Sequence, residues 1–378
     1  MSMNHSNKIR VAVVMHGDLQ KSADVRAKYS FLIEALSKRV QLVDVIDTNL
    51  RGIKRLGNAS RFFHPRLDVW RERFYKNNPA FVARSRKARK NIQSLPGKID
   101  VILQFGGMFN SFSRSQTIPN MIYTDYTSYL SSMRKLSGRS PFSAKALEKW
   151  FELEGEAYQQ AAHICTRSAY VRDSLISHYG IESEKISVVF GGVNFGTLPV
   201  EVQRPSNIPT LLFIGRDFYR KGGDILLNAF SVVRREFPTC RLWMVTDSVP
   251  DGFDMSGVEV LPPNWNRSAI RDYYRSADIL VLPSRLETWG DVLLEAMAFE
   301  LPCVGVAGEA MHEIIEHEVS GLITPPEDKD ALAAALLCLL RDPALRRRYG
   351  EAGRQRVETL FSWDIVSNKI VAQMGNVL

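Results

Sequence analysis

The chain has 378 residues, of which 45% are apolar and 24% are charged. This composition is that of a globular protein and excludes disordered and collagen-like chains. The net charge is +8, and the four cysteines show no paired or metal-binding spacing. The N-terminus leads straight into an apolar strand, and no run of about 18 apolar residues is present. We therefore expect a cytoplasmic protein without a transmembrane helix.

Short apolar β-type runs alternate with helical patterns along the chain. Expected strands are 9–15, 40–46, 100–104, 120–124, 163–166 and 186–190, followed by 210–214, 241–246, 258–260, 279–283 and 302–306. Expected helices include 24–38, 144–160, 168–179, 224–236, 267–276, 291–299, 328–341 and 343–359. Such alternation predicts parallel sheets with helices on both faces. The fold class is therefore α/β, with two doubly wound Rossmann-like domains facing across a cleft.

The segment 198–209 is the expected domain boundary, because it contains three prolines and lacks hydrophobic periodicity. It divides the chain into an N-terminal domain, 1–200, and a C-terminal domain, 201–361. Ligands of open α/β sheets bind beyond the carboxyl ends of the strands. We therefore expect the active site in the cleft between the two domains.

Positive charge is concentrated in residues 51–98, which hold fourteen Lys/Arg and only two acids, so that this segment is +12 and the remainder −4. Six aromatic residues are interleaved with the cations. Such a surface suits an anionic membrane face or an acidic acceptor. A solvated basic face with the aromatics turned inward is the equally weighted alternative. No helix-turn-helix, RNP or zinc-finger pattern accompanies the segment, so we do not expect nucleic acid as a partner.

A glycine-rich loop follows the expected strand 210–214. It contains Gly215, Arg216, Lys221 and Gly222, and a helix opens near Asp224. Glycines let a backbone approach a ligand closely, and a helix N-terminus offers free N–H groups to an anion. Arg216 and Lys221 add two cations, so the loop suits a diphosphate held without a metal. A plain turn with exposed basic side chains is the competing interpretation.

Two glutamates follow the expected strand 279–283. Glu287 lies in the loop, and Glu295 lies eight residues later in an apolar helical run. The loop N–H groups at Thr288 to Asp291 can bind an oxyanion, and Gly290 allows close approach. An acidic helix cap at Glu287 with a solvated Glu295 is the alternative. Glu295 argues against it, because a charge among leucine, alanine and methionine needs a partner.

Several other chemistries are disfavoured by spacing. The first strand is followed by His16-Gly17-Asp18, with one glycine, so a nicotinamide fingerprint is missing, as is a Walker loop. The run 312–317, HEIIEH, lacks the zinc-protease spacing, because its histidines are five residues apart. We expect no metal site.

These motifs together resemble the retaining family-4 glycosyltransferases, which have the GT-B fold. The motifs are G-R-(x4)-K-G at 215–222 and P-S-(x2)-E-(x7)-E-A-M-A at 283–298, flanked by YRSADILVLPS at 274–284 and FSW at 361–363. The resemblance covers about residues 160–365. It implies metal-independent transfer of a hexose-type sugar from a nucleotide-diphosphate sugar to a hydroxyl acceptor, with no cofactor. It also implies a C-terminal helix, about 362–378, that returns to the N-terminal domain.

The resemblance implies roles for individual residues of the C-terminal domain. Arg216 and Lys221 would hold the donor diphosphate, Glu287 would contact the donor sugar, and Glu295 would contact the ribose. Donor binding would also involve Gly215, Thr288, Trp289, Gly290 and Asp291. A further glutamate near the donor, which relatives carry, corresponds to Glu313 or to the loop at Gly308-Glu309.

The acceptor side departs from the family pattern. Many relatives carry a histidine after an N-domain strand, whereas this chain has Tyr123-Thr124-Asp125. Asp125 would orient an acceptor hydroxyl or act as a weak base, or it is only a turn residue. His16 and Gly17 follow the first strand and face the acceptor, with Tyr123 nearby. A surface histidine is an equal alternative for His16.

The acceptor expected from the family is a glycan, a glycolipid or a polyprenyl-linked sugar, in polysaccharide or cell-envelope synthesis, with 51–98 as a surface for the inner face of a membrane. A sugar-nucleotide-binding protein without activity, a nucleotide-sugar epimerase and a hydrolase are the alternative functions. The sequence leaves the donor base open among uridine, guanosine and adenosine, and it leaves the oligomeric state open.

Overall fold

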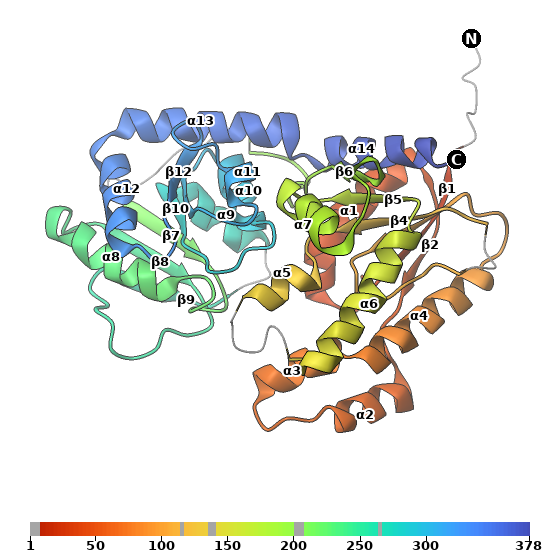
Figure 1. Ribbon diagram of the computed structural model, residues 1–378. Helices are drawn as coiled ribbons and strands as arrows, with labels where there is room; N and C mark the ends of the chain where they lie inside the picture. The colour runs from red at the N-terminus through yellow and green to blue at the C-terminus, as the bar shows by residue number, and fades with distance from the viewer. Residues whose placement is uncertain (1–7, 114–116, 135–140, 200–207, 264–266) are drawn as a thin grey trace, which may run out of the picture. The chain divides into compact units, whose positions relative to one another are not determined.

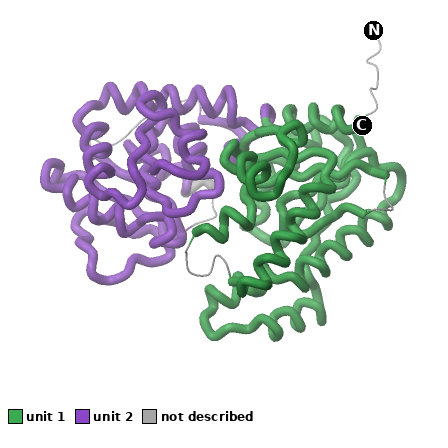
Figure 2. Tube along the Cα trace, in the orientation of Figure 1, with its two compact units in different colours: residues 1–190, 366–378 green, residues 191–365 purple. Residues whose placement is uncertain are grey.

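The computed structural model describes residues 8–113, 117–134, 141–199, 208–263 and 267–378. The chain forms two compact units, unit 1 with residues 1–190 and 366–378, and unit 2 with residues 191–365 (Figure 2). The expected linker lies largely at 200–207, outside the described residues. The units change over at 190/191, before the expected position. Val193 N–H donates to the carbonyl O of Phe361 at 2.7 Å, and the indole N–H of Trp363 donates to Asn194 Oδ1 at 3.1 Å, so this segment packs with unit 2.

Unit 1 is built on a parallel sheet with the order β2-β1-β3-β4-β5-β6 (Figure 1). Strand β1 and the three strands that follow it on one side are almost wholly buried, as expected for the inner strands of a parallel sheet. The strands are β1 (Arg10–Met15), β2 (Gln41–Asp47), β3 (Val101–Phe105), β4 (Asn120–Thr124), β5 (His163–Thr166) and β6 (Ile186–Val188). All six were expected from the sequence, with ends that shift by one or two residues.

The helices of unit 1 include three in the basic segment that the sequence pattern did not predict. These are α2 (Gly52–Arg61), α3 (Leu67–Tyr75) and α4 (Asn78–Gln93). The others are α1 (Ala23–Arg39), α5 (Ser128–Met133), α6 (Ala144–Gln160), α7 (Ala169–Tyr179) and the 3₁₀ turn Ser183–Lys185. Local chemistry sets several ends, since the Ser168 hydroxyl accepts from Val171 N–H at 3.2 Å and caps α7.

Unit 2 repeats the architecture with the sheet order β12-β11-β10-β7-β8-β9. Its strands are β7 (Thr210–Ile214), β8 (Arg241–Val245), β9 (Val258–Leu261), β10 (Ile279–Leu282), β11 (Cys303–Val306) and β12 (Gly321–Thr324). Its helices are α8 (Gly223–Glu236), α9 (Arg267–Ser276), α10 (Asp291–Ala298), α11 (Met311–Ile314), α12 (Lys329–Arg341) and α13 (Pro343–Leu360). Helices α8 and α12 lie side by side and cover one core (Figure 1). Strand β12 was not expected from the sequence.

The last helix, α14 (Trp363–Asn376), begins in unit 2 and runs into unit 1. Within unit 1 its Asn368 Oδ1 accepts from Arg39 Nε at 2.5 Å, and Lys369 lies 4.8 Å from the ring centre of Phe190. Residues 366–378, which include most of α14, thus belong to unit 1. Among the described residues, none of the helices combines the length and apolar content needed to traverse a lipid bilayer.

Candidate functional site

Three neighbouring strands of unit 2 end at one edge of the sheet, and each is followed by a loop that carries candidate residues. Strands β7, β10 and β11 are adjacent and parallel, so the loops 215–222, 283–290 and 307–310 leave the same edge. This is where ligands of open parallel sheets bind. The topology therefore brings together two motifs that are about 70 residues apart in the sequence.

Glycines make room for Lys221 in the first loop. A Cβ at Gly215 would come within 2.6 Å of Lys221 Cγ, so only glycine lets the lysine side chain pass back across the strand end. Gly222 has φ +75°, and a Cβ there would overlap the carbonyl oxygen of Pro283 in the second loop. The two loops are therefore in backbone contact at a position that excludes a side chain.

Lys221 and Glu287 form a buried ion pair, with side chains only 12% and 10% exposed. The Ser284 hydroxyl lies 3.5 Å from the same carboxylate oxygen, and the Glu287 N–H donates to the carboxylate of Glu309. Burial lowers the pKa of Lys221, and the adjacent Glu287 opposes this shift. The ammonium group of Lys221 thus contacts the carboxylate of Glu287, and the backbone of Glu287 in turn contacts the carboxylate of Glu309.

A second set of contacts holds the two loops together. The Arg285 guanidinium donates to both oxygens of Asp224, at 2.7 and 2.9 Å, and also to Glu327. The Arg220 guanidinium donates to the carbonyl O of Leu286 at 3.0 Å. Bidentate arginine contacts fix geometry as well as charge. The Lys221–Glu287 pair is thus preorganised by residues that the sequence motifs did not include.

Glu295 is 4% exposed on α10, and its carboxylate accepts from the Tyr274 hydroxyl at 2.9 Å. The sequence argument that a charge here needs a partner is confirmed. Helix α10 begins after Gly290, at φ +104°, with no side-chain cap, and α8 likewise begins after Gly222 without one. Glycine at both N-cap positions therefore leaves the two helix N-termini at this edge without a side-chain cap from the N-cap residue.

The remaining donor-side residues differ in exposure. Trp289 is 1% exposed, and its ring packs edge-on against that of Phe361, with 5.8 Å between the ring centres. Its side chain therefore anchors the loop in the core of unit 2. Thr288 and Asp291 are half-buried beside it. Arg216 is mostly exposed, and its guanidinium donates to Asp247 at 3.1 Å. An exposed pair of this kind contributes little stability, so Arg216 can exchange Asp247 for an anionic ligand.

In unit 1, Asp125 follows β4 and lies among charged side chains, with its own side chain 20% exposed and that of Lys28 36% exposed. Lys28 Nζ donates to its carboxylate at 2.5 Å. Arg167, after β5, donates to the Tyr123 hydroxyl at 3.0 Å, and that hydroxyl donates to the carbonyl O of Phe190. Burial would raise the pKa of Asp125, but Lys28 and Arg167 outweigh it and hold the pKa below its usual range. Asp125 is therefore an ionised and oriented carboxylate, and a weak base.

His16 and Gly17 follow β1 and lie in a different set of side chains from Asp125. The His16 ring contacts Tyr75 edge-on at 5.6 Å, and its buried Nδ1 has no hydrogen-bond partner among the described residues. Gly17 has φ +121°, and a Cβ there would overlap Val25. Burial, together with the nearby cation Arg84, lowers the pKa of His16 to about 3. His16 is therefore neutral at pH 7.

This depressed pKa predicts a pH dependence of stability. Below pH 6.5 the histidine is protonated in the unfolded chain but stays neutral in the folded protein. The contribution of His16 to the free energy of unfolding is therefore fully present above pH 6.5 and is lost as the pH falls toward 3. At pH 5 the loss is about 2 kcal/mol. Urea midpoints at pH 7.5 and pH 5 should therefore differ more for the wild type than for His16→Phe. Equal pH dependence in both proteins would contradict the assignment.

Glu309 is the residue at this site that sequence reasoning named only as an alternative. It is 3% exposed, has φ +51°, and accepts from the Glu287 backbone. Glu313, the other candidate, lies on α11, where its carbonyl O accepts from Arg356 at 2.9 Å. The signal for Glu309 was the Gly308-Glu309 pair directly after a strand. The second histidine of the run 312–317 lies beyond the end of α11, and no group of three metal-type side chains is found among the described residues.

Comparison with solved structures shows the class of fold. The chain superposes on sucrose-phosphate synthase from Thermosynechococcus elongatus with a TM-score of 0.70 and 17% identity, covering 98% of this chain and 99% of that one. It superposes on WaaG, a glycosyltransferase involved in lipopolysaccharide biosynthesis, with a TM-score of 0.66 and 16% identity, covering 96% and 99%. The two parallel-sheet units therefore make up a GT-B fold.

Two family models match the sequence of the two units. Residues 31–196 match Glycosyltransferase Family 4, and residues 208–342 match Glycosyl transferases group 1. The chain belongs to the family-4 glycosyltransferases. The resemblance drawn from the motifs is therefore confirmed.

Curated relatives match over part of their length. D-inositol 3-phosphate glycosyltransferase of Kineococcus radiotolerans is 29% identical over 244 residues, 56% of this chain and 56% of the relative. Glycogen synthase of Mycobacterium tuberculosis is 28% identical over 241 residues, 61% of this chain and 57% of the relative. The matched part thus spans somewhat over half the length of these relatives.

Proposed function

We propose that this protein is a retaining glycosyltransferase that moves a hexose-type sugar from a nucleotide-diphosphate sugar to an acceptor hydroxyl. The observation that carries the proposal is the buried Lys221–Glu287 pair, set between two uncapped helix N-termini at one sheet edge. A diphosphate needs positive charge and N–H donors, and a sugar needs carboxylate acceptors for its hydroxyls. The family membership agrees with this chemistry.

In the proposed reaction the bond between the anomeric carbon and the diphosphate oxygen breaks, and the diphosphate leaves with the electron pair. The acceptor oxygen bonds to the anomeric carbon on the same face, and its proton passes to the leaving phosphate. Negative charge grows on the diphosphate, and in this proposal Lys221, Arg216 and the N-terminus of α8 would stabilise it. Glu287 and Glu309 would accept from the sugar hydroxyls, and Glu295 from the ribose.

We further propose that no metal is needed, because Lys221 and Arg216 supply the charge that a divalent cation would otherwise bring. Asp125, held ionised by Lys28, would orient the acceptor hydroxyl. The acceptor would be a glycan or a lipid-linked sugar of polysaccharide or cell-envelope synthesis. The basic segment 51–98 would then serve as a surface for an anionic acceptor or an anionic membrane face.

A stability screen with UDP, GDP, ADP and dTDP, each with Mg²⁺ or with EDTA, tests the donor site. A ligand at 100 times its dissociation constant stabilises the fold by about 2.7 kcal/mol, which raises the melting temperature of a protein this size by a few degrees. We expect a shift that depends on the base, persists in EDTA and is lost in Lys221→Ala. Turnover is then followed as nucleoside diphosphate release from the matching nucleotide sugar.

The outcomes separate the alternatives. A shift without release of nucleoside diphosphate would favour a binding protein without activity. No shift with any of the four nucleotides would contradict the assignment of loop 215–222 to a diphosphate. Product analysis by NMR reports the anomeric configuration, and an inverted product would contradict retention.

A further inference from the structure

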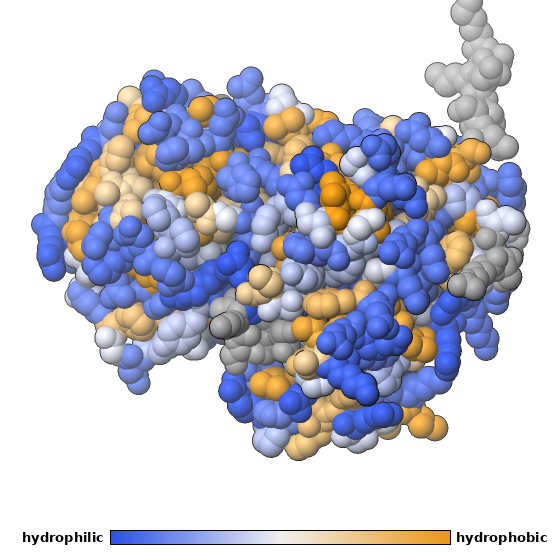
Figure 3. All heavy atoms as spheres, in the orientation of Figure 1, coloured by the Kyte–Doolittle hydropathy of each residue, from blue (hydrophilic) through white to orange (hydrophobic). Residues whose placement is uncertain are grey.

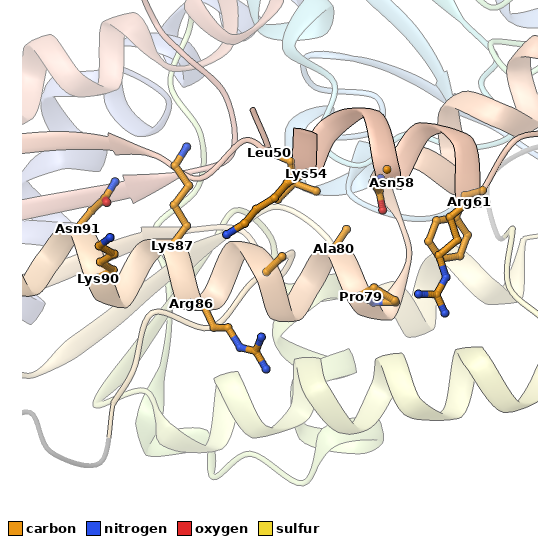
Figure 4. Close-up of a pocket in the computed structure, with 13 residues that line it drawn as sticks. Leu50, Lys54, Asn58, Arg61, Pro79, Ala80, Arg86, Lys87, Lys90 and Asn91 are labelled. Atoms are coloured by element: carbon orange, nitrogen blue, oxygen red, sulfur yellow. The ribbon is translucent and has the colours of Figure 1, made fainter. Parts of the chain in front are cut away.

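A groove lined by cations runs between α2 and α4 in unit 1. Its volume is about 760 Å³. Five of its lining residues are basic, and we call this set the α2–α4 groove: Lys54, Arg61, Arg86, Lys87 and Lys90. Figure 4 shows Lys54 reaching from α2 toward α4, with Lys87 and Lys90 on the facing helix.

Helical periodicity explains why the cations gather there. On α2, Lys54, Gly57, Asn58 and Arg61 stand at i, i+3, i+4 and i+7, so they share one face of the helix. On α4, Arg86 and Lys90 are one turn apart. Asn58 fixes the orientation of α2, because its buried amide donates to the carbonyl O of Phe74 at 2.8 Å.

The groove holds no carboxylate to balance these charges. The two acids of the segment 51–98 both lie on α3, where Asp68 pairs with Arg66 and Glu72 pairs with Lys76. In the part of the chain that the structure describes, no carboxylate lies within ion-pair distance of Lys54, Arg61, Arg86 or Lys90. Lys87 alone approaches an acid, with Nζ 4.0 Å from Asp47. Like charges around one groove repel each other, and an anionic ligand would remove that cost.

We propose that the α2–α4 groove binds a ligand that carries two or more phosphate charges. Five cations, of which only Lys87 approaches a carboxylate, carry more charge than that one carboxylate could neutralise. Each phosphate, by contrast, brings up to two charges and three acceptor oxygens. Arg61 and Arg86 offer the planar fork that phosphate oxygens accept in pairs. The proposal rests on and deepens the role proposed above for the segment 51–98, whereas the donor-site residues Lys221, Glu287 and Glu295 take no part in it.

The phosphate has two sources, a soluble polyphosphate or a lipid headgroup. Exposed apolar side chains in and just after α2 bear on the second source. Ile53 and Leu56, which lie outside the helix face that carries Lys54 and Arg61, are 88% and 70% exposed, and Phe63 is 62% exposed. Figure 3 shows apolar atoms interspersed with hydrophilic ones over this part of unit 1. Exposed apolar groups next to cations are typical of surfaces that lie at a membrane interface.

Binding of inorganic tripolyphosphate, measured by calorimetry, and binding to vesicles, measured by sedimentation, test the proposal on the full chain. The vesicles contain phosphatidylglycerol with phosphatidylcholine, or phosphatidylcholine alone. Two double variants remove the groove cations from either helix, Lys54→Gln with Arg61→Gln and Arg86→Gln with Lys90→Gln. The matched control, Lys8→Gln with Arg172→Gln, makes the same change in net charge in other elements of unit 1.

We expect each groove variant to bind the phosphate probe about tenfold more weakly or worse, and the control to bind like the wild type. Equal weakening in all three variants would overturn the proposal in favour of diffuse charge, and so would an absence of binding to both probes. Tighter binding to an RNA oligonucleotide than to either phosphate probe would also overturn it. Ile53→Ser with Leu56→Ser then separates the sources, because it weakens vesicle binding and leaves tripolyphosphate binding unchanged only if the phosphate belongs to a lipid.

Discussion

Lys221→Met should lower the turnover of the matching nucleotide sugar by about 10²–10³-fold, the cost of removing one preorganised group that stabilises transition-state charge. The same change should destabilise the protein by about 3–5 kcal/mol, because it leaves Glu287 buried without its cation. Urea unfolding and nucleoside diphosphate release measure the two effects on the same preparation. If the Lys221–Glu287 pair had only a structural role, Lys221→Met would lower the stability and leave the turnover of the folded protein unchanged.

The double variant Lys221→Met with Glu287→Gln separates the two roles. Replacing both members of a buried ion pair by uncharged groups is often neutral for stability, so most of the lost stability should return. Turnover should not return, because the charge that faces the diphosphate is still missing. Arg341→Met is the matched control, since Arg341 pairs with Glu236 at 2.5 Å on the exposed surface and its loss should cost at most about 1 kcal/mol.

Gly222→Ala should be the most damaging conservative change in unit 2. The added Cβ would overlap the carbonyl oxygen of Pro283, and φ +75° disfavours any residue with a Cβ. The clash costs about 1–3 kcal/mol and the backbone strain about 1–2 kcal/mol more. Because Gly222 also begins α8 beside Lys221, nucleotide binding in the stability screen should fall with it.

Gly252→Ala separates the strain from the clash. Gly252 has φ +99°, but a Cβ there would meet nothing within 4 Å. This variant should therefore lose only the strain energy, about 1–2 kcal/mol, and should keep its response to nucleotide. If Gly222→Ala proved no more harmful than Gly252→Ala, the close contact between the two donor loops would not be needed.

Much of the fold could be predicted because continuous apolar strands and amphipathic helices leave a periodic signal. The strand β12 and the helices α2, α3 and α4 were not predicted. Helix α2 buries only Asn58, α3 buries no side chain completely, and the six buried residues of α4 include the polar Arg84 and Ser85, so the apolar pattern of these helices is weak. The sequence predicted a basic surface over 51–98, but not the groove between α2 and α4.

Sequence motifs were enough to name Lys221, Glu287 and Glu295, because a glycine loop and a charge in an apolar run are local signals. They did not specify the partners. Glu309 accepts a hydrogen bond from the Glu287 backbone, and Glu295 accepts one from the Tyr274 hydroxyl. Arg285 of the second loop donates to Asp224 on α8. The loops that carry these contacts lie close together because β7, β10 and β11 are neighbours in the sheet. Pairings between strands far apart in the sequence depend on sheet order, which hydrophobic periodicity does not encode.

The sequence by itself thus determined the fold class, the family and the charge balance, since each depends on residue types and their local spacing. Tertiary structure alone decided which charges are paired. It left the cations of the α2–α4 groove with Asp47 as their one nearby carboxylate among the described residues, and it buried one cation of the donor loop, Lys221, against Glu287. The physical reason is distance, because Coulomb energies depend on separation in space and on local burial, not on separation along the chain.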